Sequence, residues 1–419
     1  MIDGNRMYGL LEALNFQRVS GTEGEERAAE IIRDICLSFG LAADIEPFTT
    51  PDGVVDKTQL TVVSPYTKTY EASGFKRSAS VDAQAEVVYA ENGLEANLID
   101  VEGKIVLINQ GIRHDSYGQL LKAKPLCVVV PSGEACDNVA DTDIRVGILR
   151  AVITDKHEGR LAAMHVRAAD MLHMLTNKAA EAQVTIRARD TELTSCNVTA
   201  WIAGTQFPEQ VIAMTAHYDS LDHSNGMYDN ASGSAILMEL ARYFTANPPA
   251  RSMRFVWCGS EERGLLGSKA FVAQHSDEVE KTRLCINFDL GGTIAGHEFA
   301  TVTGPDTLAY HIDMMMKEAG FAVDVKTDTY SSDCIPFADS GVPAVSVGRA
   351  GAPGMSYIHN RRDVIDYISA DALAGTGNIA LLLARRMEGA KVFPVERVIP
   401  DDMKQKIDKY LNRDNPKEA

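Results

Sequence analysis

The sequence lacks an apolar run long enough to cross a bilayer, and it does not open with a basic segment followed by an apolar stretch. A membrane-spanning helix needs about 20 predominantly apolar residues. A secretory signal needs a charged region ahead of a short apolar core. We therefore expect no membrane partner, no signal peptide and a cytoplasmic location.

Cysteine is scarce and unpatterned. The 419 residues contain seven cysteines, an odd number, and no two of them are spaced C-x-x-C. Disulfide frameworks use even numbers of cysteines in secreted chains, and zinc ribbons use paired C-x-x-C motifs. The sequence therefore predicts reduced, buried thiols rather than a disulfide framework or a zinc ribbon.

Basic residues are in deficit, with 41 Lys and Arg against 58 Asp and Glu and a net charge of −17. Binding to nucleic acid requires a basic face, so we expect no nucleic-acid partner. Several catalytic motifs are also missing. The chain has no H-E-x-x-H, no G-x-S-x-G, no Walker loop and no G-x-G-x-x-G, which argues against the enzyme classes that depend on them.

The composition that remains is globular, with 45% hydrophobic and 24% charged residues. A chain of this length exceeds what one core usually serves, so two domains are expected. Short β runs fill 58–192, whereas strands alternate with helices from 193 onward. We predict a discontinuous catalytic domain at 1–57 and 193–419, interrupted by an inserted β-rich domain at 58–192.

The alternation of strands and helices predicts an α/β fold with a mostly parallel central sheet flanked by helices. The first helix should follow Thr22, which has capping-box spacing to Glu25, and should end near Gly40. The remaining segments expected in the catalytic domain are strands at 211–216, 252–258, 284–288 and 342–347, helices at 234–244 and 378–386, and a terminal surface helix within 395–419.

Potential metal ligands follow the predicted strands of this sheet, where α/β folds build their sites. Each has an ordinary explanation alone, as a turn residue, a helix cap or a solvated charge. Together, two imidazoles and three carboxylates suit zinc. Five ligands are too many for one tetrahedral site and fit two ions that share a carboxylate and a water. These residues are His217, Asp229, Glu262, Asp289 and His359.

The motifs around these residues resemble the co-catalytic di-zinc aminopeptidases, an MH-clan metallopeptidase family that includes aminopeptidase Y, bacterial leucyl aminopeptidases and glutamate carboxypeptidase. The matching segments are TAHYDS, GMYDNASG, CGSEERGLLGSKAFV, NFDLGG, YSSDCIPF and YIHNRRD. The resemblance covers about 1–57 and 193–395. The insert is similar to the protease-associated (PA) domain, with 98–108 as its most typical piece.

The resemblance implies two zinc ions per chain, although the sequence leaves other divalent ions open. His217 and Asp289 would hold one ion, Glu262 and His359 the other, and Asp229 would bridge them. The peptide bond after Asp229 is cis in this family.

The resemblance also implies roles around the ions. Glu261 would be the general base for a hydroxide that bridges the ions. Asp219 would accept the free N–H of His217 and fix its tautomer. Tyr330 resembles a family tyrosine whose hydroxyl stabilises the oxyanion.

Other polar residues near the motifs are expected to have ordinary roles. We expect Asp333 and Cys334 to be structural, and His223 and His297 to have no direct part in the chemistry. Solvated loop cations are the preferred interpretation of Arg349, Arg361 and Arg362, with recognition of a substrate carboxylate as the alternative.

The expected function is that of a metallo-aminopeptidase, with peptides as substrates. A dipeptidase or carboxypeptidase of the same family, acting on small peptides, is the first alternative. A binding protein on the same scaffold would have lost ligands that this chain keeps. Glutaminyl cyclase, a one-zinc relative, lacks the Asp-Asn-Ala-Ser-Gly segment present here. The sequence leaves open a homo-oligomer, and an insert that acts as a lid or as a dimerisation surface.

Overall fold

The structure, a computed structural model, describes residues 2–137 and 142–413. The chain divides into two compact units. Among the described residues, the first unit contains 2–49 and 194–413, and the second contains Thr50–Leu193. The chain leaves the first unit within β1 (Ala43–Ser64) and returns within β8 (Glu181–Ile202). The sequence placed these boundaries at 57/58 and 192/193.

The first unit is built on a mixed sheet in the order β13-β12-β14-β11-β9-β10-β8. The four central strands, β14, β11, β9 and β10, run parallel, whereas β12 pairs antiparallel with β14 and β8 antiparallel with β10. The expected mostly parallel sheet is therefore confirmed at its centre. The bounds are β9 (Phe207–His217), β10 (Arg251–Cys258), β11 (Thr282–Phe288), β12 (Gly296–Thr303), β13 (Val323–Thr327) and β14 (Ala344–Gly351).

Side chains of the central strands alternate between two hydrophobic cores, because successive strand residues point to opposite faces. On β9, Ile212 and Met214 belong to one core and Ala213 to the other. On β10, Trp257 and Val256 divide in the same way. Both faces of the sheet are therefore buried, as a parallel sheet requires.

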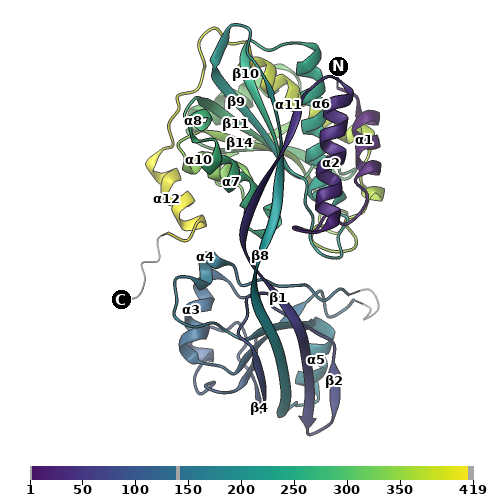
Figure 1. Cartoon of the computed structure of the whole chain (residues 1–419), viewed down its shortest axis with the longest axis vertical. Helices are drawn as coiled ribbons and strands as arrows, with labels where there is room; N and C mark the ends of the chain where they lie inside the picture. The colour runs from purple at the N-terminus through teal and green to yellow at the C-terminus, as the bar shows by residue number, and fades with distance from the viewer. Residues whose placement is uncertain (1, 138–141, 414–419) are drawn as a thin grey trace. The chain divides into compact units, whose positions relative to one another are not determined.

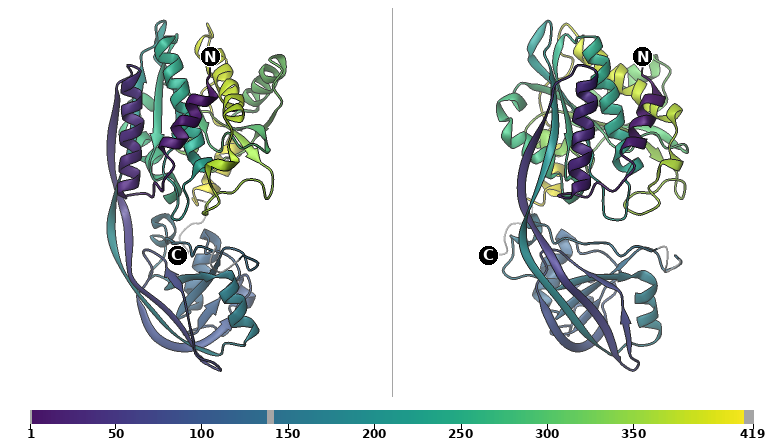
Figure 2. Two further views of the ribbon diagram at one scale, coloured as in Figure 1. Left: turned by 90° about the vertical axis from the view of Figure 1, so that its right-hand side faces the viewer. Right: turned by 45° about the vertical axis from the view of Figure 1, so that its right-hand side comes forward.

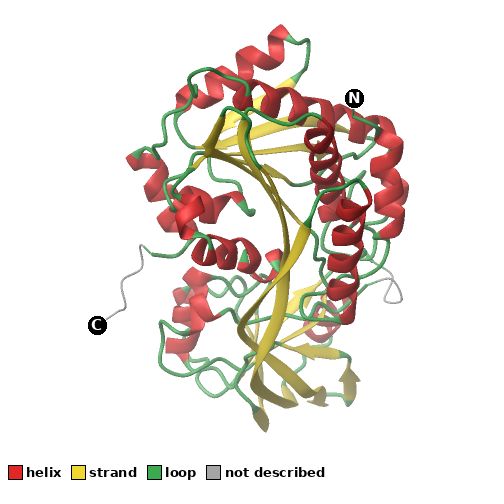
Figure 3. Ribbon diagram, turned by 45° about the horizontal axis from the view of Figure 1, so that its top comes forward, coloured by secondary structure: helices red, strands yellow, loops and turns green. Residues whose placement is uncertain are grey.

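Helices cover both faces of this sheet (Figures 1 and 3). On one side, α1, α2, α6 and α11 pack together, and Figure 2 shows the two N-terminal helices beside α6 and α11. On the other side lie α7, α10 and α12. The helix bounds are α1 (Gly4–Ala13), α2 (Glu23–Ser38), α6 (Ser232–Ala246), α7 (Leu266–Gln274), α8 (Ser276–Val279), α9 (Asp306–Glu318), α10 (Cys334–Asp339), α11 (Ala370–Glu388) and α12 (Asp401–Tyr410).

The expected segments correspond to elements of the structure, with shifts at their ends. The strand predicted at 342–347 begins two residues later, at Ala344, after Pro343, which has no N–H for the sheet. The helix predicted at 378–386 is α11, which begins eight residues earlier after Ser369, whose hydroxyl accepts from Ala372 N–H. Its glycines, Gly375 and Gly377, weaken the helical pattern in the sequence.

The capping box predicted at Thr22 is wrong. Thr22 is the N-cap residue of α2, but its hydroxyl donates to Val19 O at 2.6 Å instead of capping the helix. The carboxylate of Glu25 accepts from Gly21 N–H at 2.6 Å and otherwise contacts residues far away in the chain. Tertiary contacts have therefore overridden the local motif.

The second unit has a sheet in the order β8-β4-β5-β6-β7-β3, with β2 paired to β1. It is less purely β than expected, because three α-helices accompany the strands in the described parts of this unit. A PA domain remains a prediction. The bounds are β2 (Lys68–Tyr70), β3 (Ala72–Gly74), β4 (Val81–Tyr89), β5 (Ile105–Leu107), β6 (Cys127–Ser132), β7 (Ala163–Arg167), α3 (His114–Ala123), α4 (Ala151–Thr154) and α5 (Ala168–Thr176).

The seven cysteines are all free thiols. Five are buried as expected, whereas Cys136 is exposed and Cys196 is half-buried. Across residues 2–137 and 142–413, no helix has both the length and the apolar character needed to cross a membrane.

Candidate metal centre

The site lies at the carboxyl ends of the central parallel strands. His217 is the last residue of β9 and is paired with Cys258, the last residue of β10. Asp289 follows β11 directly, and the loop after β14 leads to His359. Because adjacent parallel strands end at one edge of the sheet, these loops converge there.

Two groups of potential ligands meet at this edge, and they share one residue. His217, Asp229 and Asp289 offer ligand atoms that all lie within 4.8 Å of one another, and so do Asp229, Glu262 and His359. All five ligands expected from the sequence are present in these two groups.

The carboxylate of Asp229 lies between the two groups. Its Oδ1 is 3.2 Å from Nε2 of His217, which in turn is 3.6 Å from Oδ1 of Asp289. Its Oδ2 is 3.1 Å from Nε2 of His359, which is 3.3 Å from Oε2 of Glu262. One oxygen of Asp229 therefore faces each group, which is the arrangement a bridging carboxylate needs.

The carboxylates gathered at this edge of the sheet favour the binding of cations. Burial by itself would lower the pKa of His217, but Glu261, Asp219, Asp229 and Asp289 raise it well above its ordinary range.

Glu262 is likewise surrounded by other carboxylates. Burial and the charge of Asp229 raise the pKa of Glu262 to about 8. Buried carboxylates this close together repel one another unless protons or metal ions intervene. Imidazole nitrogens and carboxylate oxygens are the donors that zinc takes in proteins, so these residues fit a pair of zinc ions.

Asp219 connects the first histidine to the loop after β10. It is completely buried, and its Oδ1 lies 3.4 Å from Nδ1 of His217. Its two oxygens also accept the backbone N–H groups of Glu261, at 2.9 Å, and Glu262, at 3.2 Å. Asp219 is therefore placed to orient the imidazole and the Glu261–Glu262 turn together.

The turn that carries Asp229 is held from several sides. It lies in the irregular segment η3 (Met227–Ala231), and the Asp229–Asn230 peptide bond is cis, which confirms that expectation. The Asn230 amide donates to Phe288 O at 2.8 Å and accepts from Gly233 N–H at 2.9 Å. These bonds tie the turn to the end of β11 and to the start of α6.

Glu261 begins η4 (Glu261–Arg263) but belongs to neither ligand group. Burial raises the pKa of the Glu261 carboxyl well above its usual range, whereas His217 acts to lower it. A carboxylate that stays close to the ligands without joining them is free to exchange protons with a reacting group.

Tyr330 lies near the same edge, with its ring 5.4 Å from that of Phe299. Burial, Asp289 and Asp229 all raise the pKa of its hydroxyl, which therefore stays a proton donor. Cys334 is buried and accepts a hydrogen bond from the hydroxyl of Ser346 at 3.2 Å.

The remaining polar residues lie outside the two ligand groups. Asp333 is buried, and its own burial raises its pKa to about 6. Arg349 is not a solvated cation, because it pairs with Glu298 at 3.0 Å and donates to Thr293 O. Arg362 lies over the ring of Tyr357, with 5.6 Å between the guanidinium carbon and the ring centroid. Three of these polar residues are exposed: Arg361, His223 and His297.

Sequence reasoning missed several residues that hold the site together. Asp363 accepts the N–H groups of Tyr228 and Asp229. Arg18 is fully buried and donates to the carbonyls of Tyr218, at 2.6 Å, and Gly226, at 2.8 Å. No local pattern marks these roles, because each depends on contacts with distant segments.

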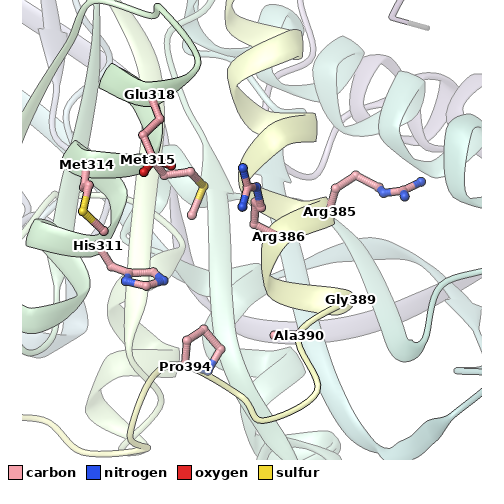
Figure 4. A pocket seen from close by; sticks show the side chains of 9 residues that line it. All are labelled: His311, Met314, Met315, Glu318, Arg385, Arg386, Gly389, Ala390 and Pro394. Atoms are coloured by element: carbon pink, nitrogen blue, oxygen red, sulfur yellow. The ribbon is translucent and has the colours of Figure 1, made fainter.

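A surface cavity of about 440 Å³ lies elsewhere in the first unit, between α9 and α11 (Figure 4). Its lining includes His311, Glu318 and Arg386 but none of the five candidate ligands. Arg386 is in the last turn of α11, where a cation is favourable to the helix dipole. The arginine therefore has a structural explanation.

The chain is similar in sequence to known peptidases. Residues 197–384 match the sequence model of peptidase family M28. The chain is 25% identical over 408 residues to aminopeptidase YwaD of Bacillus subtilis, a match that covers 93% of this chain and 85% of that protein.

Two solved structures have a similar fold. A zinc aminopeptidase from Bacillus subtilis has a TM-score of 0.77 at 21% identity, covering 96% of this chain and 99% of that one. An aminopeptidase from Aneurinibacillus sp. strain AM-1 has a TM-score of 0.74 at 24% identity, covering 95% and 96%.

Proposed function

Because the chain belongs to peptidase family M28, we propose that it is a zinc-dependent aminopeptidase, an exopeptidase that hydrolyses the amino-terminal peptide bond of peptides. The observation that carries the proposal is the position of Asp229, whose two carboxylate oxygens face two separate ligand groups. The names of the similar proteins support the substrate class.

In this proposal, His217 and Asp289 would hold one zinc ion, Glu262 and His359 would hold the other, and Asp229 would be a ligand shared by the two. When bound, zinc ions at these residues would supply Lewis-acid chemistry: a lower pKa for the attacking water and polarisation of the scissile carbonyl.

The chain's own residues move the proton and hold the reacting groups. Glu261 accepts the proton of the attacking water and returns it to the nitrogen of the leaving amine. Asp219, whose Oδ1 lies 3.4 Å from Nδ1 of His217, would orient the imidazole so that Nε2 is the ligand atom. The Tyr330 hydroxyl donates to the carbonyl oxygen as it gains negative charge.

The test is a chelation-and-restoration assay on a panel of substrates. The panel contains aminoacyl-p-nitroanilides, the same compounds acetylated at the amino group, and free dipeptides. We expect cleavage of the free-amine nitroanilides, loss of activity after chelation and recovery with zinc. Zinc analysis should give about two ions per chain.

Other results would reject parts of the proposal. Cleavage of the acetylated compounds would exclude recognition of the amino terminus. Cleavage of dipeptides alone would favour a dipeptidase. Less than one zinc ion per chain, with no activity on any compound, would favour a binding protein on the same scaffold.

A further inference from the structure

Glu25 is a buried carboxylate that connects three distant segments of the first unit. It lies in the first turn of α2 and is 2% exposed. Its Oε2 accepts from Gly21 N–H at 2.6 Å. Its Oε1 accepts from the Ser195 hydroxyl at 2.8 Å, and from Ser260 through the backbone N–H at 3.0 Å and the hydroxyl at 3.2 Å.

Ser260 is the residue directly before the Glu261–Glu262 turn. It is fully buried and has a left-handed backbone, with φ of +53°. The preceding residue, Gly259, has no room for a side chain. A Cβ at this position would lie 2.3 Å from Cys196 O and 3.0 Å from Oε1 of Glu25. The entry to the turn is therefore packed directly against Glu25.

Two carboxylates together hold the backbone of this turn. Glu25 accepts the N–H of Ser260, and Asp219 accepts those of Glu261 and Glu262. Three consecutive N–H groups thus point at two buried anions, which resembles the backbone nests that bind anions in other folds. The Ser20 hydroxyl donates to Asp219 at 3.1 Å, next to the Gly21 N–H that donates to Glu25.

We propose that Glu25 is a positioning residue for the reaction: by fixing the N–H of Ser260, it sets the direction in which the turn presents Glu261 to the substrate and Glu262 to the metal. This inference rests on the proposed function. Glu25 is a member of neither ligand group, and its bond to the turn is made through Ser260.

The charge of Glu25 is disfavoured where it lies. Burial and the neighbouring Asp219 raise its pKa to about 7, although hydrogen bonds from Gly21, Ser195 and Ser260 act to lower it. The feature of Glu25 that matters here is the length of its side chain, which lets its carboxylate reach the backbone of Ser260.

Two conservative variants of Glu25 separate the effect of side-chain length from the effect of charge. Glu25→Gln keeps the length of the side chain and an oxygen that can accept from Ser260. Glu25→Asp keeps the charge but withdraws the carboxylate by about 1.5 Å, the length of one C–C bond. Ile32→Ala, in the buried face of the same helix, is the control for a general loss of stability.

We expect Glu25→Asp to lower kcat by about 10–100-fold with KM changed less than 3-fold, because a displacement near 1 Å misaligns a catalytic group. Glu25→Gln should restore kcat to within about 5-fold of the native value. Ile32→Ala should lower the midpoint of thermal unfolding but leave kcat within 3-fold.

A second measurement does not depend on activity. Amide hydrogen exchange at Ser260 and Glu261 in the metal-free protein should be at least 10-fold faster in Glu25→Asp than in native protein or Glu25→Gln. A failure of the proposed function alone would leave this result unchanged. The inference is overturned if Glu25→Asp keeps native kcat, if Ile32→Ala loses as much kcat, or if exchange at Ser260 is unchanged.

Discussion

The carboxylate of Asp363 accepts a hydrogen bond from the backbone N–H of Asp229, with an N···O distance of 3.1 Å. The same carboxylate accepts the N–H of Tyr228 at 2.7 Å, and Asp363 is 1% exposed. A residue four positions after His359 thus fixes the backbone of the shared ligand. The segment carrying one histidine and the turn carrying Asp229 are therefore held together even without a metal ion.

We predict that Asp363→Ala lowers zinc affinity by about 10–100-fold, because residues that orient ligands have effects of this size. Asp363→Asn should lower zinc affinity less, since the amide oxygen of the new side chain can still accept a hydrogen bond from one of the two N–H groups. The affinity is measured by competition with a chromogenic chelator. Asp366→Asn, an exposed change in the same segment, is the control, and an equal loss in that variant would contradict the prediction.

Replacing Glu261, the proposed general base, should lower the turnover rate without removing the metal. Glu261→Gln keeps the shape of the side chain but cannot take up a proton. We expect kcat to fall by about 10²–10⁴-fold while the zinc content stays that of the native protein. Steady-state kinetics and metal analysis of one preparation test both parts. Normal turnover in this variant would remove Glu261 from the mechanism.

His165 should make the second unit sensitive to acid. Its ring is 7% exposed and stacks on Phe75 with centroids 4.3 Å apart. Burial, and then the charge of Arg145, lower the pKa of His165 to about 4 from an ordinary value of 6.5. Between these values the unfolded state binds more protons, so stability is present above pH 6.5 and is lost as the pH falls towards 4.

The predicted loss attributable to His165 is about 3 kcal/mol at pH 4 and below. His165→Phe keeps a ring against Phe75 but does not titrate. The difference in unfolding free energy between pH 7 and pH 4, measured with urea, should therefore be smaller in this variant by up to that amount. An identical difference in the two proteins would show that His165 does not contribute.

Gly233, at the start of α6, should tolerate no side chain. A Cβ there would lie 2.3 Å from both Oδ1 of Asn230 and the carbonyl oxygen of Phe288. Gly233→Ala should therefore displace the turn after Asp229, destabilise the protein by about 1–3 kcal/mol and reduce zinc affinity.

The matched control is Gly9→Ala in α1, where nothing lies within 4 Å of the added carbon. That change should stabilise the protein by up to about 1 kcal/mol. Urea unfolding of both variants tests the pair, and equal effects would show that space around Gly233 is not the cause.

The sequence predicted the sheet and the candidate ligands because both leave local marks. A buried strand followed by a charged residue, as at Phe288 and Asp289, is visible without any knowledge of the fold. Arg18 and Asp363 left no such mark, since their partners lie in distant segments. The capping box predicted at Thr22 failed for the same reason. The spacing of Glu25 from Thr22 suits a cap, but Ser260 and Ser195 donate hydrogen bonds to the Glu25 carboxylate.

The pairing of α1 with α11 has a consequence for biosynthesis. Gly4–Ala13 emerges from the ribosome hundreds of residues before Ala370–Glu388, its packing partner. At elongation rates of about 5–20 residues per second, the nascent helix waits on the order of 20–70 s for that partner. The intervening Thr50–Leu193, whose own sheet is contiguous in the chain, can assemble during this interval, so the unit that contains Gly4–Ala13 finishes folding after it.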